Sequence, residues 1–321
     1  MLNHNSINIW VIPISQIFIS DNMVDHPTGD IMNSEDPDSI HLTAETYYHG
    51  NGVEQSYAKA AELFRKAADM GHARSQFSMG HMYEFGYGVE QSYVQAAKWY
   101  RKAAERNDPV AQRCLGVLYE HGYGLKMSCV RAAKWYRRSA IQGDPISQRY
   151  LADMYECGKG VTQSYKRAAK WYSLSSEQGD TTAQRCLGVL YEYGNGVEQS
   201  YEMAAELYRL SAEQEDMYAQ WNLGDLYECG NGVEQSYVTA MELYRASAEQ
   251  GNPVAQHSLG DMYYEGKGVE RSFETAAEWY LKAAEQGFLD SQYRLGHMYQ
   301  RGEGVERSEE ESRRWFDMWQ S

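Results

Sequence analysis

Apolar residues along the chain recur at spacings of three and four, which is the pattern of a helix that buries one face. Two neighbouring groups show the pattern clearly: Ala111, Cys114, Leu115, Leu118 and Tyr119 form the first, and Ala132, Ala133, Trp135, Tyr136 and Ala140 form the second. Polar residues occupy the positions between them. The pattern predicts two amphipathic helices of about a dozen residues, joined by a short connection.

Capping residues mark the ends of these two helices. Asp108-Pro109 places an N-cap side chain before a proline at the first helical position, where a missing N–H has no cost. Gly122-Tyr123-Gly124 ends the first helix, because glycine adopts the positive φ of a helix C-cap. Ser128 then caps the second helix. The segment is therefore predicted to be a helix-turn-helix unit.

The same unit recurs along the chain with a period of 36 residues. Its Gly-x-Gly pairs lie at Gly50/Gly52, Gly86/Gly88, Gly122/Gly124, Gly158/Gly160, Gly194/Gly196, Gly230/Gly232, Gly266/Gly268 and Gly302/Gly304. No insertion interrupts the register. We therefore predict an all-α, right-handed superhelical solenoid of about eight 36-residue antiparallel helix pairs over residues 36–321.

Glycine also recurs inside the first helix of six units, where it costs about 1 kcal/mol relative to alanine. These residues are Gly80, Gly116, Gly188, Gly224, Gly260 and Gly296. Paired alanines such as Ala96-Ala97 offer a shallow surface against which the glycines could pack. Tight helix packing is the expected reason for the glycines.

The two ends of the array differ from its middle. Asp36-Pro37 starts the first unit in register, but Thr43-Ala44 replaces the usual Leu-Gly pair. A final helix from Ser308 to Trp319 is expected to bury Trp315, Phe316 and Trp319. Residues 1–35 are predicted to form a disordered acidic leader. Their apolar stretch 9–19 leaves open a secretory signal, although no basic residue precedes it.

Composition narrows the classes of partner. The formal net charge of −15 disfavours nucleic acid and anionic membrane surfaces. No stretch reaches the roughly 20 apolar residues of a membrane-spanning helix. Five cysteines, an odd number, favour free thiols in a reducing compartment, so a cytoplasmic location is expected.

The repeat motif resembles that of the Sel1-like repeat family. It consists of Ala111-Gln112, Leu115-Gly116, Tyr119, Gly122 and Gly124, with Tyr93, Ala96, Trp99-Tyr100 and Ala103-Ala104 from the preceding unit. The resemblance implies superhelices related to tetratricopeptide arrays, and adaptor functions. Where the family often has Asp before the second helix, this chain has Ser, which also caps. A cysteine-rich branch reported to bind β-lactams has paired cysteines where this chain has Ala104 and Gln112.

Positions that vary between units are free to be exposed, and three of them lie four residues apart on the first helix. The first position holds Phe77, Arg113, Arg149, Arg185, Trp221, His257 and Tyr293 in successive units. The second holds His81, Val117, Asp153, Val189, Asp225, Asp261 and His297. The third holds Phe85, His121, Cys157, Tyr193, Cys229, Glu265 and Arg301. We predict that this face lines the concave groove and binds a partner.

Within that face, three arginines form a ladder with one rung per unit. Arg113, Arg149 and Arg185 could hold carboxylates of a partner protein or peptide. Trp221, Tyr218 and Tyr293 could add aromatic anchors, and Asp153, Asp225 and Asp261 share the face. The alternative is that the arginines are paired with Glu120, Glu156 and Glu192.

No catalytic, cofactor-binding or metal-binding residue is predicted. Cysteines lack the close spacing of zinc ligands, and the Gly-x-Gly pairs end helices instead of opening one after a strand. We therefore predict a non-enzymatic protein-binding scaffold or adaptor. The alternatives are a secreted or host-directed bacterial repeat protein and, by analogy with the cysteine-rich branch, a hydrolase.

Overall fold

A computed structural model describes residues 36–320, and within that range the chain forms sixteen α-helices and no strand. The first helices of the eight units are α1 (Pro37–His49), α3 (Ala73–Phe85), α5 (Pro109–His121), α7 (Pro145–Cys157), α9 (Thr181–Tyr193), α11 (Met217–Cys229), α13 (Pro253–Glu265) and α15 (Leu289–Arg301). The second helices are α2 (Tyr57–Asp69), α4 (Tyr93–Glu105), α6 (Cys129–Ile141), α8 (Tyr165–Ser176), α10 (Tyr201–Ala212), α12 (Tyr237–Glu249), α14 (Phe273–Glu285) and α16 (Glu309–Gln320). The all-helical repeat array is confirmed, and the predicted leader lies outside the described residues.

The predicted caps are present. The Asp108 side chain accepts a hydrogen bond from the backbone N–H of Ala111 at 2.7 Å, which starts α5. Gly122 ends α5 with a φ of 76°, in the left-handed region that glycine tolerates best. Ser128 starts α6 by accepting from the N–H of Arg131. Local sequence signals therefore fix where these helices begin and end.

The glycines inside the first helices face an aromatic ring of the second helix. A Cβ added at Gly116 would lie 2.5 Å from the Tyr136 ring, closer than any real contact. The predicted tight packing is therefore present, but the atoms nearest to the glycine belong to tyrosine and not to the paired alanines. Tyr136 is fully buried, as are its equivalents in five other units, Tyr100, Tyr172, Tyr208, Tyr244 and Tyr280. A buried tyrosine of the second helix thus forms part of the core in units 2 to 7.

Glutamine hydrogen bonds link most units to the one before. The Gln112 amide donates to the backbone oxygen of Ala104 in α4 and accepts from Gln142, which follows α6. The same Gln-to-Gln bond recurs in units 4 to 7, from Gln178, Gln214, Gln250 and Gln286. The Gln-to-Gln bonds lie within units, so successive units are connected by the bond from Gln112 to Ala104 and by its equivalents from Gln148 and Gln256.

The C-terminal helix packs on the array as expected, with one exception. Trp315 is buried, and the Phe316 ring lies against Gly296 in the place that tyrosine takes in other units. Trp319 was expected to be buried, but 39% of it is exposed, and its ring lies against Tyr293 at the surface of α15.

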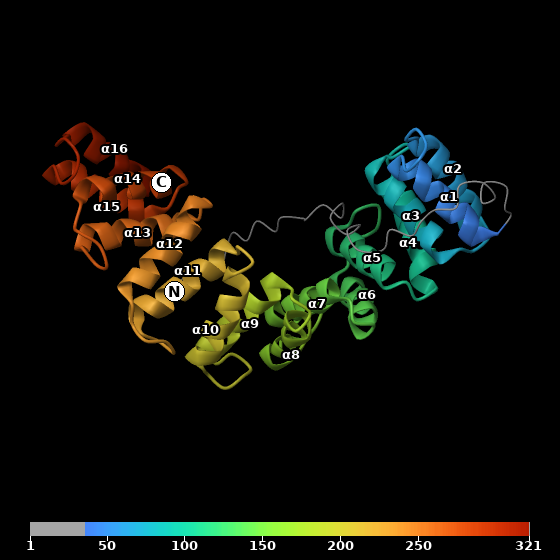
Figure 1. Ribbon diagram of the computed structural model, residues 1–321, viewed down its shortest axis with the longest axis horizontal. Coiled ribbons are helices and arrows are strands. Elements are labelled where there is room, and N and C mark those ends of the chain that lie inside the picture. The colour runs from blue at the N-terminus through green and yellow to red at the C-terminus, as the bar shows by residue number, and fades with distance from the viewer. Residues whose placement is uncertain (1–35, 321) are drawn as a thin grey trace.

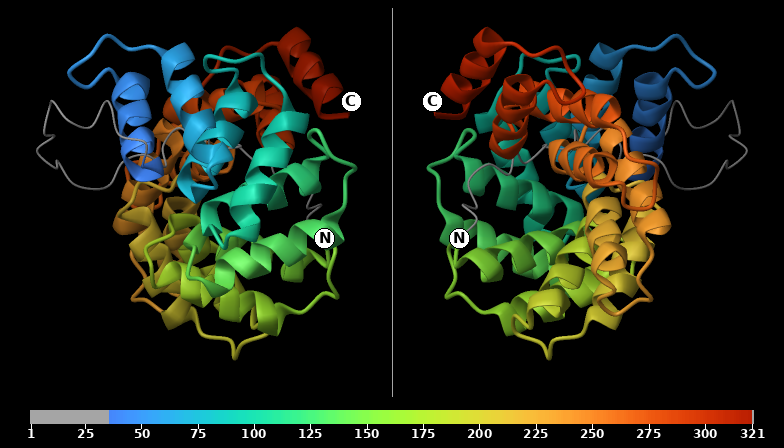
Figure 2. Two further views of the ribbon diagram at one scale, coloured as in Figure 1. Left: turned by 90° about the vertical axis from the view of Figure 1, so that its right-hand side faces the viewer. Right: turned by 90° about the vertical axis from the view of Figure 1, so that its left-hand side faces the viewer.

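The units wind into a curved superhelix (Figures 1 and 2). Side chains of successive first helices bond directly to one another, as Trp221 does with Ser258 at 3.1 Å and His257 with Ser291 at 2.9 Å. The second helices instead reach the following unit through its first helix, as in the bond between Gln112 and Ala104. Since the closer-packed side of a curved stack is its inner side, we assign the inner face to the first helices. No helix in residues 36–320 is long and apolar enough to span a membrane.

Candidate functional site

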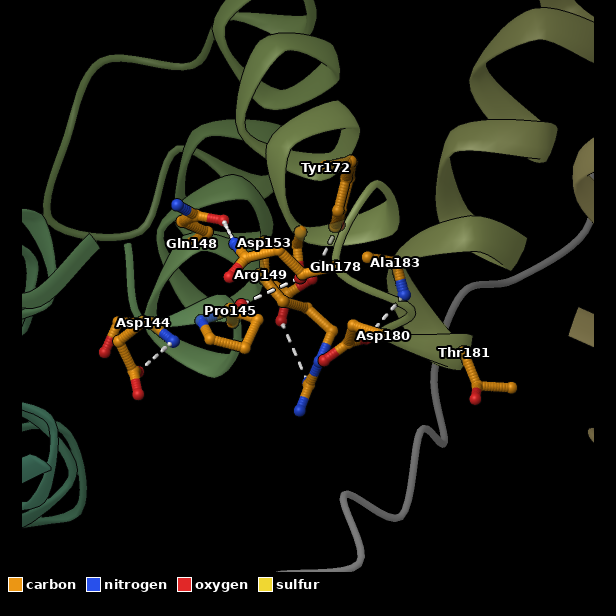
Figure 3. A network of polar contacts seen from close by, with 12 residues as sticks. Asp144, Pro145, Gln148, Arg149, Asp153, Tyr172, Gln178, Asp180, Thr181 and Ala183 are labelled. Atoms are coloured by element: carbon orange, nitrogen blue, oxygen red, sulfur yellow. Dashed lines mark hydrogen bonds and ion pairs between the residues drawn. The ribbon is translucent and has the colours of Figure 1, made fainter. Parts of the chain in front are cut away.

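The inner face carries the variable positions, and the arginine ladder is its most ordered feature. The Arg113 guanidinium lies 2.7 Å from Asp144, that of Arg149 lies 3.1 Å from Asp180, and that of Arg185 lies 3.3 Å from Asp216. Each aspartate is the N-cap of the first helix in the following unit. Figure 3 shows this arrangement around Arg149 in unit 4. The arginines therefore join neighbouring units.

This geometry corrects the environment expected for the arginines. They were expected either to form a free positive stripe or to pair with glutamates, and the structure shows neither. Arg113 is only 5% exposed, and its charge is compensated by an equally buried carboxylate. Capture of an acidic partner by the ladder stays a prediction, and these ion pairs give it no support.

The glutamates expected as arginine partners accept hydrogen bonds from the buried tyrosines instead. Oxygen-to-oxygen distances lie between 2.5 and 2.9 Å in the pairs Tyr100–Glu84, Tyr136–Glu120, Tyr172–Glu156, Tyr208–Glu192 and Tyr244–Glu228. The hydroxyl of Tyr172 also donates to Asp153 (Figure 3). These glutamates therefore form a row of carboxylates along the inner face. Each accepts a hydrogen bond from the tyrosine hydroxyl of the second helix in its own unit.

A sequence comparison of the units could have revealed the correct ion pairs. Arg recurs three times together with an aspartate 31 residues later. In unit 6, Trp221 replaces the arginine and Asn252 replaces the aspartate cap. In units 3 to 6 the two charges are therefore present together or absent together, which is the signal of a paired position.

Loop lysines neutralise some of the glutamates and leave others free. Lys159, between the two loop glycines of unit 4, lies 2.8 Å from Glu120 of the preceding unit, and Lys267 lies 3.3 Å from Glu228. The equivalent loop residues in units 5 and 6 are Asn195 and Asn231. The glutamates that these would reach, Glu156 and Glu192, therefore have no lysine partner among the described residues.

Four carboxylates form what we call the central acidic patch: Asp153, Glu156, Glu192 and Asp225. Burial raises the pKa of Asp225, and the charges of Glu192 and Glu228 raise it further. Burial also raises the pKa of Asp153 to about 6, although the Tyr172 hydroxyl opposes the shift. Repulsion between these neighbouring carboxylates favours the binding of a cation.

Two exposed tyrosines lie on α9 and α11, the helices that carry Glu192 and Asp225. Tyr193, at the end of α9, is 65% exposed, and Tyr218, at the start of α11, is 47% exposed. Trp221 is half-buried and donates to Ser258, and the Arg185 guanidinium lies 5.3 Å from the centre of the Tyr218 ring. Tyr193 was named among the variable residues but not among the binding residues.

The structure does not bring all the predicted binding residues together. Asp261 is already bonded to Tyr280 at 2.5 Å and lies near Arg294 and His257. Tyr293 lies in the last unit, where it contacts His297 and Trp319. Asp153, Asp225, Tyr218 and Trp221 lie on α7 and α11, in the middle of the array.

A serine between two histidines joins units 1 and 2 and was not predicted. The Ser75 hydroxyl lies 2.9 Å from His41 and 2.8 Å from His72. Each histidine also faces a carboxylate, Glu45 for His41 and Asp38 for His72. The residue types match a hydrolytic triad, but Ser75 is 0% exposed, so it cannot contact a substrate.

This cluster makes the start of α3 sensitive to pH. His72 is the N-cap, and its Nδ1 accepts the N–H of Ser75 at 3.2 Å. Burial lowers the pKa of His72, with His41 acting in the same direction and Asp38 opposing. A lowered pKa means that the neutral ring stabilises the fold, so this stability is complete above the usual histidine pKa and is lost as the pH falls.

We expect His72→Asn to remove this pH dependence, because an asparagine cap does not titrate and already starts α13 in unit 7. Amide hydrogen exchange should show α1 and the first turn of α3 opening more at about pH 5 than at about pH 7.5 in the natural protein, by about 1 kcal/mol. The variant should show little change. An equal change in the variant would assign the effect to another group.

Thiol and metal chemistry find little support in the described part of the chain. Burial raises the pKa of the Cys114 and Cys186 thiols, and also that of the exposed Cys157 and Cys229. All four are therefore protonated near neutral pH and poorly nucleophilic. Among residues 36–320, no group of three or more His, Cys, Asp or Glu side chains has the arrangement of a metal site.

The fold and its inner face define a helical-repeat scaffold of stacked helix pairs. The family model described as Sel1 repeat matches eight consecutive segments, residues 37–72, 73–108, 109–144, 145–180, 181–216, 218–252, 253–288 and 289–319. The chain belongs to the Sel1 repeat family. Proteins of this fold are typically protein-interaction scaffolds.

Two solved structures are similar along most of the chain. The first is c5321, described as a protective antigen of uropathogenic Escherichia coli, with 38% identity and a TM-score of 0.84 over 90% of this chain and 62% of that one. The second is a Sel1 repeat protein from Oxalobacter formigenes, with 30% identity and a TM-score of 0.70 over 89% of this chain and 83% of that one. This chain therefore spans less than two thirds of the E. coli protein. No curated protein matches it.

Proposed function

We propose that this protein is a non-enzymatic scaffold that binds a segment of a partner protein along the inner face of units 4 to 6. The observation that carries the proposal is the central acidic patch. Glu156, Glu192 and Asp225 have no ion pair within residues 36–320, and the one ion pair of Asp153 is a 3.9 Å contact with Arg149, which also binds Asp180. Glu120 and Glu228 on either side each have a lysine. Carboxylates that the array's own cations neutralise weakly or not at all favour the binding of a cation from a partner.

The neighbouring side chains define the chemistry of the partner. Tyr193 and Tyr218 offer exposed rings on the helices that carry Glu192 and Asp225, and aromatic residues contribute strongly to protein interfaces. Rings and carboxylates together suit lysine or arginine side chains, through ion pairs and cation–π contacts. The proposed ligand is therefore a basic segment, in place of the acidic one that the arginine ladder alone suggested.

Two variants with equal charge changes test this proposal. Asp153→Lys with Asp225→Lys places two positive charges in the central acidic patch and should reduce recovery of bound proteins by about tenfold or more. The control, Glu62→Lys with Glu242→Lys, makes the same change on exposed positions of α2 and α12, outside the central acidic patch. Quantitative mass spectrometry after affinity purification measures both. Equal losses in the two variants would show that net charge alone controls binding.

The host-directed alternative has one observation in its favour. The E. coli protein that is 38% identical to this chain is described as a protective antigen. A repeat protein acting outside its cell could use the same inner face. Fractionation of cells and culture medium separates this alternative from the cytoplasmic location that the free cysteines predict.

A further inference from the structure

The outer surface of units 2 to 4 is basic, although the whole chain is acidic. The second helices α4, α6 and α8 expose ten basic residues, Lys98, Arg101, Lys102, Arg131, Lys134, Arg137, Arg138, Lys166, Arg167 and Lys170. Glu105 is the one acidic residue within these three helices. We call this surface the basic outer face.

None of these ten side chains forms an ion pair within residues 36–320. Several instead lie on aromatic rings of the array. The Lys102 ammonium lies 3.8 Å from the Trp99 ring centre, the Arg138 guanidinium lies 4.6 Å from that of Trp135, and Arg101 donates to the Tyr119 hydroxyl at 2.7 Å. These contacts hold the cations in place while leaving their charge uncompensated.

The same helix positions carry the opposite charge in the next three units. Lys98, Lys134 and Lys170 occupy one position of α4, α6 and α8, and Glu206, Glu242 and Glu278 occupy it in α10, α12 and α14. All six are exposed. The same helix forms with lysine at this position in three units and with glutamate in three others. Folding therefore does not depend on the sign of the charge at this position. The charge of the outer face therefore changes sign between units 4 and 5.

We propose that the basic outer face binds an acidic polypeptide segment, separately from the ligand of the inner face. Charge complementarity selects Asp- and Glu-rich sequences. Exposed apolar residues between the cations, Val94, Val130 and Ile141, match the side chains of a polypeptide. A long nucleic acid or a membrane would also meet the glutamates of α10, α12 and α14. A segment confined to three units meets only the local positive charge, since salt screens beyond about 8 Å.

A labelled peptide of repeated Glu-Glu-Leu triplets, long enough to span three units, provides the probe. We expect it to bind the full chain and to lose affinity about tenfold or more when Lys98, Lys134 and Lys170 are all changed to Glu. A matched control changes Arg209, Arg245 and Lys282 to Glu on α10, α12 and α14, with the same change in net charge. That control should bind within about twofold of the natural protein. A Lys-to-Gln version of the first variant covers the case in which charge reversal prevents folding.

Three results would overturn the proposal. The first is an equal loss of affinity in the matched control, and the second is equal binding of a Gln-Gln-Leu peptide. The third is tighter binding of single-stranded DNA or phosphatidylserine vesicles than of the acidic peptide, which would assign the face to another polyanion. None of these outcomes bears on the inner face, because the central acidic patch is unchanged in every variant.

Discussion

Replacing Arg113 with methionine should destabilise the protein by about 3 kcal/mol or more, because it leaves the buried carboxylate of Asp144 without its counter-ion. The side chains of Arg113 and Asp144 are 6% and 10% exposed, so water cannot replace the lost partner. Asp144 also caps α7 by accepting from the N–H of Ser147. Urea denaturation followed by circular dichroism measures the change in the free energy of unfolding.

The array supplies a compensating change for this variant. Unit 6 has tryptophan and asparagine at the two positions, so Arg113→Trp with Asp144→Asn reproduces a pair that this fold already contains. We expect the double variant to regain at least half of the lost stability, because asparagine still caps α7 without carrying a charge. A double variant as unstable as Arg113→Met would show that the ion pair is not the cause.

Replacing Gly88 with alanine should cost about 3 kcal/mol, because an added Cβ would lie 2.2 Å from the backbone oxygen of Tyr57. Gly88 is the second glycine of its loop, and it packs on the start of α2 in the preceding unit. It also has a φ of 66°, which alanine adopts only with strain. Neither the helix start nor the loop can move without separating the two units. Thermal and urea denaturation measure the loss.

Gly52 separates the two causes of this loss. It occupies the same place in unit 1 with a φ of 73°, but no described atom lies within 4 Å of its added Cβ. Gly52→Ala should therefore cost only the backbone strain, about 1 kcal/mol. If both variants lost the same stability, packing between units would not be the reason for glycine in this loop.

The fold was predictable from the sequence because each unit repeats its own local signals. Asp108 and Ser128 begin helices and Gly122 ends one, and these preferences act within a few residues. A period of 36 residues then fixes the stacking. Trp319 was placed wrongly, because helix periodicity shows which face of a helix is apolar but not whether a neighbouring helix covers it.

The site was only partly predictable, because its charges pair across units. The ladder of Arg113, Arg149 and Arg185 was found, but its partners were not, since they lie 31 residues away on the cap of the next helix. The net charge of −15 also concealed a basic surface. The net charge is a sum over the whole chain, so it does not show where the charges lie. Comparing equivalent positions of the units, such as Lys98 and Glu206, does show it.

The central claim is that partner proteins contact the inner face of units 4 to 6, and photo-crosslinking tests it most directly. A benzoylphenylalanine at Tyr193 places the reactive group beside the central acidic patch, and one at Val238 places it on the outer side of α12, where the side chain is similarly exposed. In cells that make the protein, we expect crosslinks to a defined set of proteins from position 193 and few from position 238. Equal crosslinking from both positions, or crosslinks from position 238 alone, would contradict the account.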